Sequence, residues 1–143
     1  MRQPDEFICI SYPLIDFLIP NEYVVSAVSV KDLDITPDLS KTTGFFDFDK
    51  IASTFMQTSR KANIKTMVVL RPDDDERVSI ITAQECKVCT IPLKNFALFS
   101  DVYSEPLKKM GLLACSFIED RIRFLIDIKK ITEFMSDNLV EEL

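Results

Sequence analysis

Phe46-Asp47-Phe48-Asp49-Lys50-Ile51 returns later in the chain as Ile126-Asp127-Ile128-Lys129-Lys130-Ile131. The two aspartates lie 80 positions apart, and in each copy an apolar strand is expected to end at the aspartate before a helix begins. An aspartate at a helix start accepts hydrogen bonds from free backbone N–H groups and meets the positive end of the helix dipole. The repeated pattern therefore predicts two similar halves, each ending in a strand, a capping aspartate and a helix.

Outside these junctions the sequence predicts a mainly β chain, because β-branched and aromatic runs alternate with proline, asparagine and acidic turns. Two hairpins are expected, one over 67–82 around a polar turn and one over 112–126 around Glu119-Asp120. Further strands are expected over 7–12, 14–19, 23–30 and 86–93. A short helix is expected over 49–58 and a terminal helix, with an apolar stripe, over 131–139.

The composition is that of a single compact domain over 1–143, since 143 residues with 47% apolar content can bury a continuous core. A formal charge of -6 argues against nucleic acid or an anionic membrane as a partner. No apolar run approaches the roughly 20 residues that span a bilayer, and residues 1–6 do not resemble a secretory signal. We therefore expect a cytoplasmic protein.

The chain contains no histidine and only two glycines, and these counts limit which catalytic, metal-binding and phosphate-binding sites it can form. Histidine is the commonest general base, the usual partner of a catalytic serine or cysteine, and the commonest metal ligand. Gly44 and Gly111 cannot by themselves form a glycine-rich phosphate loop. We therefore predict no catalytic residue, no bound cofactor and no enzymatic activity.

Four cysteines are present, and we expect them to be reduced because the apolar core does not need disulfides. Cys86-Lys87-Val88-Cys89 is a CxxC motif, which could be a redox pair or half of a zinc site. The strand-like alternation instead places Cys86 and Val88 on one face and Cys89 on the other. A zinc site would also need Cys9, Cys115 or carboxylates as further ligands. We predict no metal site, and keep a thiol or metal sensor at Cys86 and Cys89 as the alternative.

Other polar or apolar clusters have structural explanations that are simpler than functional ones. The acidic run 73–76 could hold a hard cation, but it lacks the spaced ligands and central glycine of a calcium loop, so a solvated turn is favoured. Asp47 and Asp127 could form an acid–base pair, but helix capping is favoured. The apolar stripe of the terminal helix could bind a partner, but packing against its own domain is favoured.

Taken in order, three parts of the chain resemble the CheW-like family of bacterial chemotaxis coupling domains. Residues 21–33 are similar to an early family strand in which a tyrosine and alternating aliphatics lead to a valine, one further residue, an acidic residue and an aliphatic. Residues 67–70, 78–81 and 86–92 resemble the hairpin and following strand of the family's second half. Residues 111–131 are similar to the closing strand pair with its aliphatic-aspartate-aliphatic signature.

The resemblance implies a fold of two pseudo-symmetric, SH3-like, five-stranded β-barrel subdomains with short helices and a C-terminal helix. It implies a non-catalytic adaptor that bridges chemoreceptor cytoplasmic tips to the regulatory domain of the histidine kinase CheA. Val30 and Asp32 match the valine and acidic positions at the family's receptor-contacting surface, so they are the partner-binding candidates. A buried strand residue and a solvated strand end are the competing interpretations of these two positions.

One segment departs from the family pattern. The family carries a longer insertion with an asparagine-leucine-arginine-glycine motif where this chain has only 34–46, which contains no arginine. Because that arginine is tied to receptor binding in the family, two readings stay open: a divergent coupling protein, or a relative that kept the fold and changed partners. An apolar ligand inside one barrel is a third possibility, for which the sequence gives no direct sign.

Overall fold

The computed structural model describes residues 6–31, 44–53, 64–98 and 108–138, and the elements whose bounds lie within these ranges are ten strands, two α-helices and two 3₁₀ turns. In chain order the elements are β1 (Glu6–Tyr12), β2 (Ile15–Pro20), η1 (Asn21–Tyr23), β3 (Val24–Lys31), β4 (Gly44–Asp47), α1 (Phe48–Ala52), β5 (Ile64–Leu70), β6 (Val78–Thr82), β7 (Glu85–Thr90), η3 (Leu93–Asn95), β8 (Ala97–Leu98), β9 (Leu112–Ile118), β10 (Arg121–Ile126) and α3 (Ile128–Asn138).

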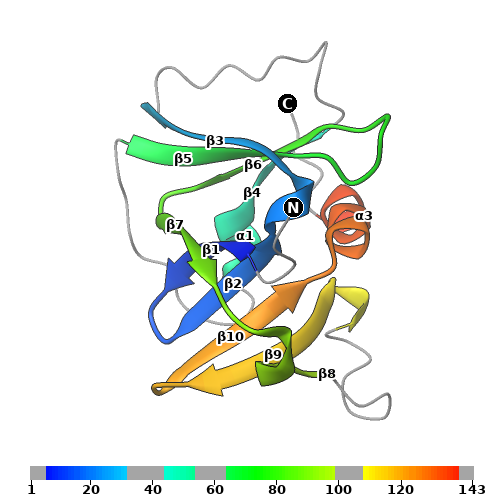
Figure 1. Ribbon diagram of the computed structural model, residues 1–143. Helices are drawn as coiled ribbons and strands as arrows, with labels where there is room; N and C mark the ends of the chain where they lie inside the picture. The colour runs from blue at the N-terminus through cyan, green and yellow to red at the C-terminus, as the bar shows by residue number, and fades with distance from the viewer. Residues whose placement is uncertain (1–5, 32–43, 54–63, 99–107, 139–143) are drawn as a thin grey trace.

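The strands form two sheets, which we call sheet A and sheet B. Sheet A has six strands in the order β7-β1-β2-β10-β9-β8, and sheet B has four in the order β3-β5-β6-β4. In Figure 1 sheet B occupies the upper part of the molecule and sheet A the lower part, with α3 at the right. The prediction of a mainly β chain with a terminal helix is therefore confirmed.

Both sheets have the same pairing pattern, in which a central hairpin has a parallel strand on one side and an antiparallel strand on the other. In sheet A the hairpin β1–β2 is extended by β10, which runs parallel to β2, and by β7, which runs antiparallel to β1. In sheet B the hairpin β5–β6 is extended by β4, parallel to β6, and by β3, antiparallel to β5. Sheet A joins β1 and β2 to strands from the later part of the chain, so it cannot form from one contiguous segment. The four strands of sheet B, by contrast, follow one another along the chain between Val24 and Thr82.

The local predictions match the described elements, with three differences. The strand expected over 86–93 ends at Thr90, and Leu93 begins the 3₁₀ turn η3. Both hairpins form, and in the second the turn residues Glu119 and Asp120 have φ of 55° and 64°, the geometry of a tight type I′ turn. The helix expected over 49–58 ends at Ala52 with Ser53 as its C-cap, and 54–58 lie outside the described residues. The described strands divide six and four rather than five and five. No pairing closes either sheet within the described ranges, so the barrels and the single-domain assignment of 1–143 stay predictions.

The main hydrophobic core combines residues of both sheets and both helices. Phe17 of β2 is fully buried and makes edge-to-face contacts with Tyr12 of β1 and Phe48 of α1, at ring separations of 5.6 and 5.3 Å. It also contacts Phe124 of β10 at 5.8 Å. Aromatic pairs in this geometry contribute beyond their buried area, so Phe17 joins the two parts of sheet A to α1.

The two aspartate junctions adopt the predicted caps. Asp47 accepts a hydrogen bond at 3.0 Å from the backbone N–H of Asp49 in the first turn of α1. Asp127 accepts one at 3.2 Å from the N–H of Lys130 in the first turn of α3. Each side chain satisfies a backbone donor that the helix leaves unpaired, and the acid–base alternative gains no support.

Gly111 allows β9 to begin directly against α3. Its φ is +94°, and a Cβ atom there would lie 2.5 Å from the backbone nitrogen of Ile131. Its carbonyl accepts a hydrogen bond at 2.8 Å from the N–H of Asp127. A residue without a side chain is therefore required where the last strand pair meets the terminal helix.

Candidate partner-binding surfaces

The two partner-binding residues predicted from sequence lie at the end of β3. Val30 belongs to this strand, where its backbone is paired with Lys65 of β5, but its side chain lies outside the description. Asp32 lies outside the described residues altogether. Their role as contact residues stays a prediction, and the described part of β3 leads directly up to them.

Strand β3 is exposed on both of its faces. It is the end strand of sheet B and pairs with β5 alone among the described strands. All five residues from 25 to 29 are exposed, including Val25 at 53% and Val28 at 45%. The register shifts between Val24 and Ser26, which places a bulge at the start of the strand. Sequence reasoning identified this strand but could not tell that its apolar side chains face solvent.

A second apolar surface lies on sheet A, at the turn ends of β2, β9 and β10. Phe117 and Leu14 are each 68% exposed, and Ile122 is 36% exposed. Ile122 is paired with Phe117 on one side and with Ile15 on the other, and its N–H donates to the carbonyl of Leu14 at 2.9 Å. We call Leu14, Phe117 and Ile122 the hairpin-end patch. No sequence motif indicated it, since its members come from separate turns.

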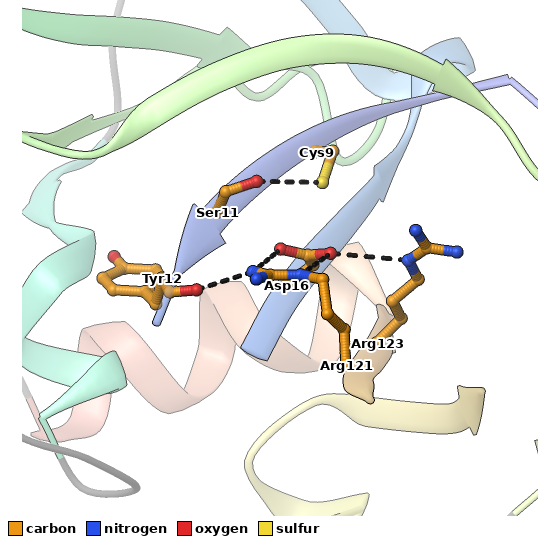
Figure 2. A network of polar contacts seen from close by, with 6 residues as sticks. All are labelled: Cys9, Ser11, Tyr12, Asp16, Arg121 and Arg123. Carbon is orange, nitrogen blue, oxygen red and sulfur yellow. Dashed lines mark hydrogen bonds and ion pairs between the residues drawn. The ribbon is translucent and has the colours of Figure 1, made fainter. Parts of the chain in front are cut away.

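The other face of sheet A carries a buried ion-pair network. Asp16 of β2 is only 3% exposed, and its two carboxylate oxygens accept from Nε and Nη2 of Arg121 at 3.0 and 2.5 Å. Nη2 of Arg121 also donates to the backbone carbonyl of Tyr12 at 2.6 Å, and Nε of Arg123 donates to Asp16 at 3.4 Å (Figure 2). Both arginines come from β10, so the network fastens this strand to β2.

The charges of this network shift the pKa values of its members. Burial alone would raise the pKa of Asp16, but the hydrogen bonds and charge of Arg121 outweigh it and hold that pKa below its usual value. The hydrogen bonds to Asp16 raise the pKa of Arg121. A carboxylate that is ionised and fully hydrogen-bonded in this way has no proton to transfer near neutral pH. The geometry therefore supports a structural role rather than acid–base chemistry.

A second polar cluster fastens α1 to the two sheets. One carboxylate oxygen of Asp49 accepts from the hydroxyls of Tyr12 at 2.5 Å and Thr82 at 2.6 Å, and the other accepts from the N–H of Ala83 at 3.0 Å. Burial, followed by the charge of Asp49, raises the pKa of Tyr12. The tyrosine therefore stays protonated and donates. Sequence reasoning singled out Asp47 and missed this role of its neighbour.

The cysteines of the CxxC motif lie on different faces of β7, as the alternation predicted. Cys86 packs against the main core, whereas Cys89 packs against a smaller apolar cluster on the second face of sheet A, which includes Cys9. Burial raises the pKa of Cys86 to about 11. A hydrogen bond from Cys89 lowers the pKa of Cys9 to about 7. The contact between thiols is thus Cys9 with Cys89, not Cys86 with Cys89.

The acidic run forms the solvated turn that was expected. Asp73, Asp74 and Asp75 are exposed, and the Asp73 carboxylate accepts from the N–H of Asp75 at 2.9 Å. Across the described parts of the chain, no three cysteine, aspartate or glutamate side chains are grouped as metal ligands. No helix of the described residues has the length and apolar character needed to cross a membrane.

These features define a two-sheet β fold whose polar clusters connect its own elements. Most of its large exposed apolar residues lie on β3 and at the hairpin-end patch, while Val88 and Leu113 are exposed elsewhere on sheet A. No family model matches the sequence, and no curated protein matches it. The fold is similar to that of the scaffolding protein TtCheW from Thermoanaerobacter tengcongensis, with a TM-score of 0.57 and 13% sequence identity. The similarity covers 87% of this chain and 89% of that one. The fold is therefore CheW-like, which confirms the predicted resemblance at the level of fold.

Proposed function

We propose that this protein is a non-catalytic adaptor of chemotaxis-type signal transduction that bridges chemoreceptor cytoplasmic tips and the regulatory domain of the histidine kinase CheA in the cytoplasm. The observation that carries the proposal is the CheW-like fold, because the structural similarity spans nearly the whole of both chains. Fold alone does not fix function, so the proposal also rests on the surfaces that the chain presents.

A bridging protein needs two surfaces that can be occupied at once, and the described residues offer two. Strand β3 is the edge of sheet B, and the hairpin-end patch belongs to sheet A. Exposed apolar groups that cluster in this way, rather than being scattered singly, are typical of protein interaction sites. We assign one partner to each surface, with the receptor tip at β3, where Val30 and the following Asp32 are the predicted contact residues.

The proposal keeps one alternative, a CheW-fold protein whose partners have changed. It is motivated by residues 34–46, which lack the arginine tied to receptor binding in the family. The sensor alternative at Cys86 and Cys89 loses support, because the two thiols face different apolar clusters.

Binding measurements on the purified chain test the proposal. Isothermal titration with the CheA regulatory domain and, separately, with a receptor tip peptide should each give a saturable complex. Val28→Lys should weaken receptor binding at least tenfold and leave CheA binding intact. Phe117→Lys should have the opposite effect, because each lysine places a charge on one apolar surface.

Val88→Lys is the matched control, since Val88 is an exposed valine (61%) on the edge strand β7 of sheet A. It should leave both affinities unchanged. If the chain binds neither partner at high micromolar concentration, the coupling role is wrong. If it binds CheA but not the receptor tip, the reading with changed partners replaces it.

A further inference from the structure

The second face of sheet A brings together two thiols that lie 80 positions apart in the sequence. In the antiparallel pairing of β1 with β7, Cys9 lies opposite Lys87 and Cys89 lies opposite Phe7. Because side chains alternate between the two faces of a sheet, Cys9 and Cys89 share one face and are diagonal neighbours across the two strands. Both pack in the small apolar cluster around Leu18.

The two thiols differ in how they hold their protons. The Cys89 thiol donates a hydrogen bond to the Cys9 sulfur, which lowers the pKa of Cys9 to about 7 and raises the pKa of Cys89. Burial opposes the first shift, but the Ser11 hydroxyl, 3.6 Å from the Cys9 sulfur, lowers the pKa of Cys9 further (Figure 2). The charge of Lys87 acts in the same direction and that of Asp16 against it. Cys9 is therefore the thiolate of the pair, and Cys89 keeps the proton.

The other two cysteines are arranged differently. Cys86 packs against the main core, and burial raises its pKa to about 11. Cys115 of β9 also packs against the main core, whereas Cys9 belongs to the cluster on the second face. A thiolate with a second thiol beside it is the arrangement of redox-sensitive cysteines, in which one sulfur is oxidised and its neighbour resolves the product.

We propose that Cys9 and Cys89 form a modification site, which hydrogen peroxide converts into a reversible disulfide between β1 and β7. The Cys9 thiolate attacks one peroxide oxygen, the O–O bond breaks, and the departing hydroxide takes a proton to become water. The Cys89 sulfur then attacks the sulfur of the Cys9 sulfenic acid, and the hydroxyl leaves with the Cys89 proton as a second water. The two thiols lose two electrons and the peroxide gains them. The inference does not depend on the adaptor function.

Strand β7 supplies the movement that this bond requires. Diagonal neighbours have Cα atoms about 7–8 Å apart and a disulfide spans at most about 6.8 Å, so the strands must approach by about 1 Å at this point. Strand β7 is an end strand and pairs with β1 alone among the described strands, so it can shift without breaking a second ladder. Cys9 is 2% exposed and Cys89 is half-buried, so displacement of β7 also admits the small peroxide to Cys9.

Peptide mapping of the full chain after treatment with hydrogen peroxide tests the disulfide. Trypsin cleaves after lysine and arginine, so it places the four cysteines in four different peptides, which cover 3–31, 78–87, 88–94 and 110–121. Oxidation should remove two hydrogens from the intact mass and link 3–31 to 88–94. Free thiols should fall from four to two, and dithiothreitol should restore all four.

Three variants separate the roles of the two sulfurs. Cys89→Ser should abolish the link and leave Cys9 as a sulfenic acid that dimedone traps. Cys9→Ala should slow peroxide consumption at least tenfold. Cys86→Ser is the matched control on the same strand, and it should form the link at the wild-type rate.

Each other result would overturn the inference. A link between 78–87 and 88–94, a link to 110–121, a disulfide between two copies of the chain, or four free thiols after peroxide treatment would show that Cys9 and Cys89 are not the reactive pair. Loss of the link in Cys86→Ser would assign the chemistry to the CxxC motif. The wild-type map decides between these results even where a variant fails to fold.

Discussion

Sheet A and sheet B have the same pattern of pairing but differ in what covers them. In each, a hairpin is extended by a parallel strand that leads to a capped helix and by an antiparallel edge strand. Sheet A is packed on its second face by the Asp16 network and by a small apolar cluster around Leu18, and its edge β7 is charged. Sheet B has the edge strand β3, whose residues 25–29 are exposed and which carries no charge before Lys31. The shared topology therefore does not decide which edge is available; the side chains do.

The largest expected difference between the sheets lies in their cores. Phe17→Ala in sheet A removes a fully buried ring that contacts three aromatic neighbours, so it should lower the free energy of unfolding by about 4 kcal/mol. Ile80→Ala in sheet B should cost about 3 kcal/mol, because Ile80 is equally buried but smaller. Urea denaturation of both variants measures this. A larger loss for Ile80→Ala would contradict the placement of the main aromatic contacts in sheet A.

Alanine substitutions at the two glycines compare the contact of sheet A with α3, at Gly111, with the start of β4 in sheet B, at Gly44. Gly111→Ala should cost about 3 kcal/mol, because the new methyl group would meet the backbone of Ile131 and φ of +94° is strained for alanine. Gly44→Ala at the start of β4 should cost less than about 1 kcal/mol, since its methyl group would meet the edge of the Phe46 ring, which can rotate away. Thermal unfolding of both variants gives the comparison, and equal losses would contradict the close approach at Gly111.

Asp16→Asn tests the second face of sheet A. Removing the buried carboxylate should cost about 2 kcal/mol at pH 7, less than for a fully buried pair because Arg121 is 32% exposed. The pKa of Asp16 is lowered on folding, so its contribution is complete above the unfolded value of about 3.9 and is lost as the pH falls through the folded value. The difference from wild type should therefore shrink below pH 4. A constant difference from pH 7 to pH 2.5 would contradict the ion pair.

The smallest expected effect has the opposite sign. Ser116 of β9, paired with Arg123, is buried, and its hydroxyl finds no hydrogen-bond partner in the described structure. Ser116→Ala removes an unsatisfied polar group and should raise the free energy of unfolding by about 0.5–1 kcal/mol. Ser79→Ala is the control in sheet B, because Ser79 is equally buried but its interactions are satisfied. It should be neutral or destabilising, and a loss of stability in Ser116→Ala would point to a partner for this hydroxyl.

Much of the fold follows from local sequence patterns. The hairpins over 67–82 and 112–126, the capping roles of Asp47 and Asp127, and the separation of Cys86 from Cys89 all depend on neighbours in the chain. The first helix ends at Ala52 with Ser53 as its C-cap, earlier than the apolar spacing of Ile51, Phe55 and Met56 predicts. The hairpin-end patch could not be predicted, since Leu14 and Phe117 come to lie on either side of Ile122 only when β2 and β9 flank β10.

The sequence by itself determined that this protein is mainly β, that an aspartate starts each of two helices, and that common catalytic and phosphate-binding motifs are missing, because these properties follow from residue type and near neighbours. The tertiary structure decided which strands pair within each sheet, which thiols pack in the same cluster, and which edge is unpaired among the described strands. These outcomes depend on contacts between residues far apart in the chain, where burial and pairing are set by the partner strand and not by the local pattern. The repeat of residues 46–51 at 126–131 predicts where the two halves of the chain end. The pairing of early and late strands within one sheet shows how the halves are joined.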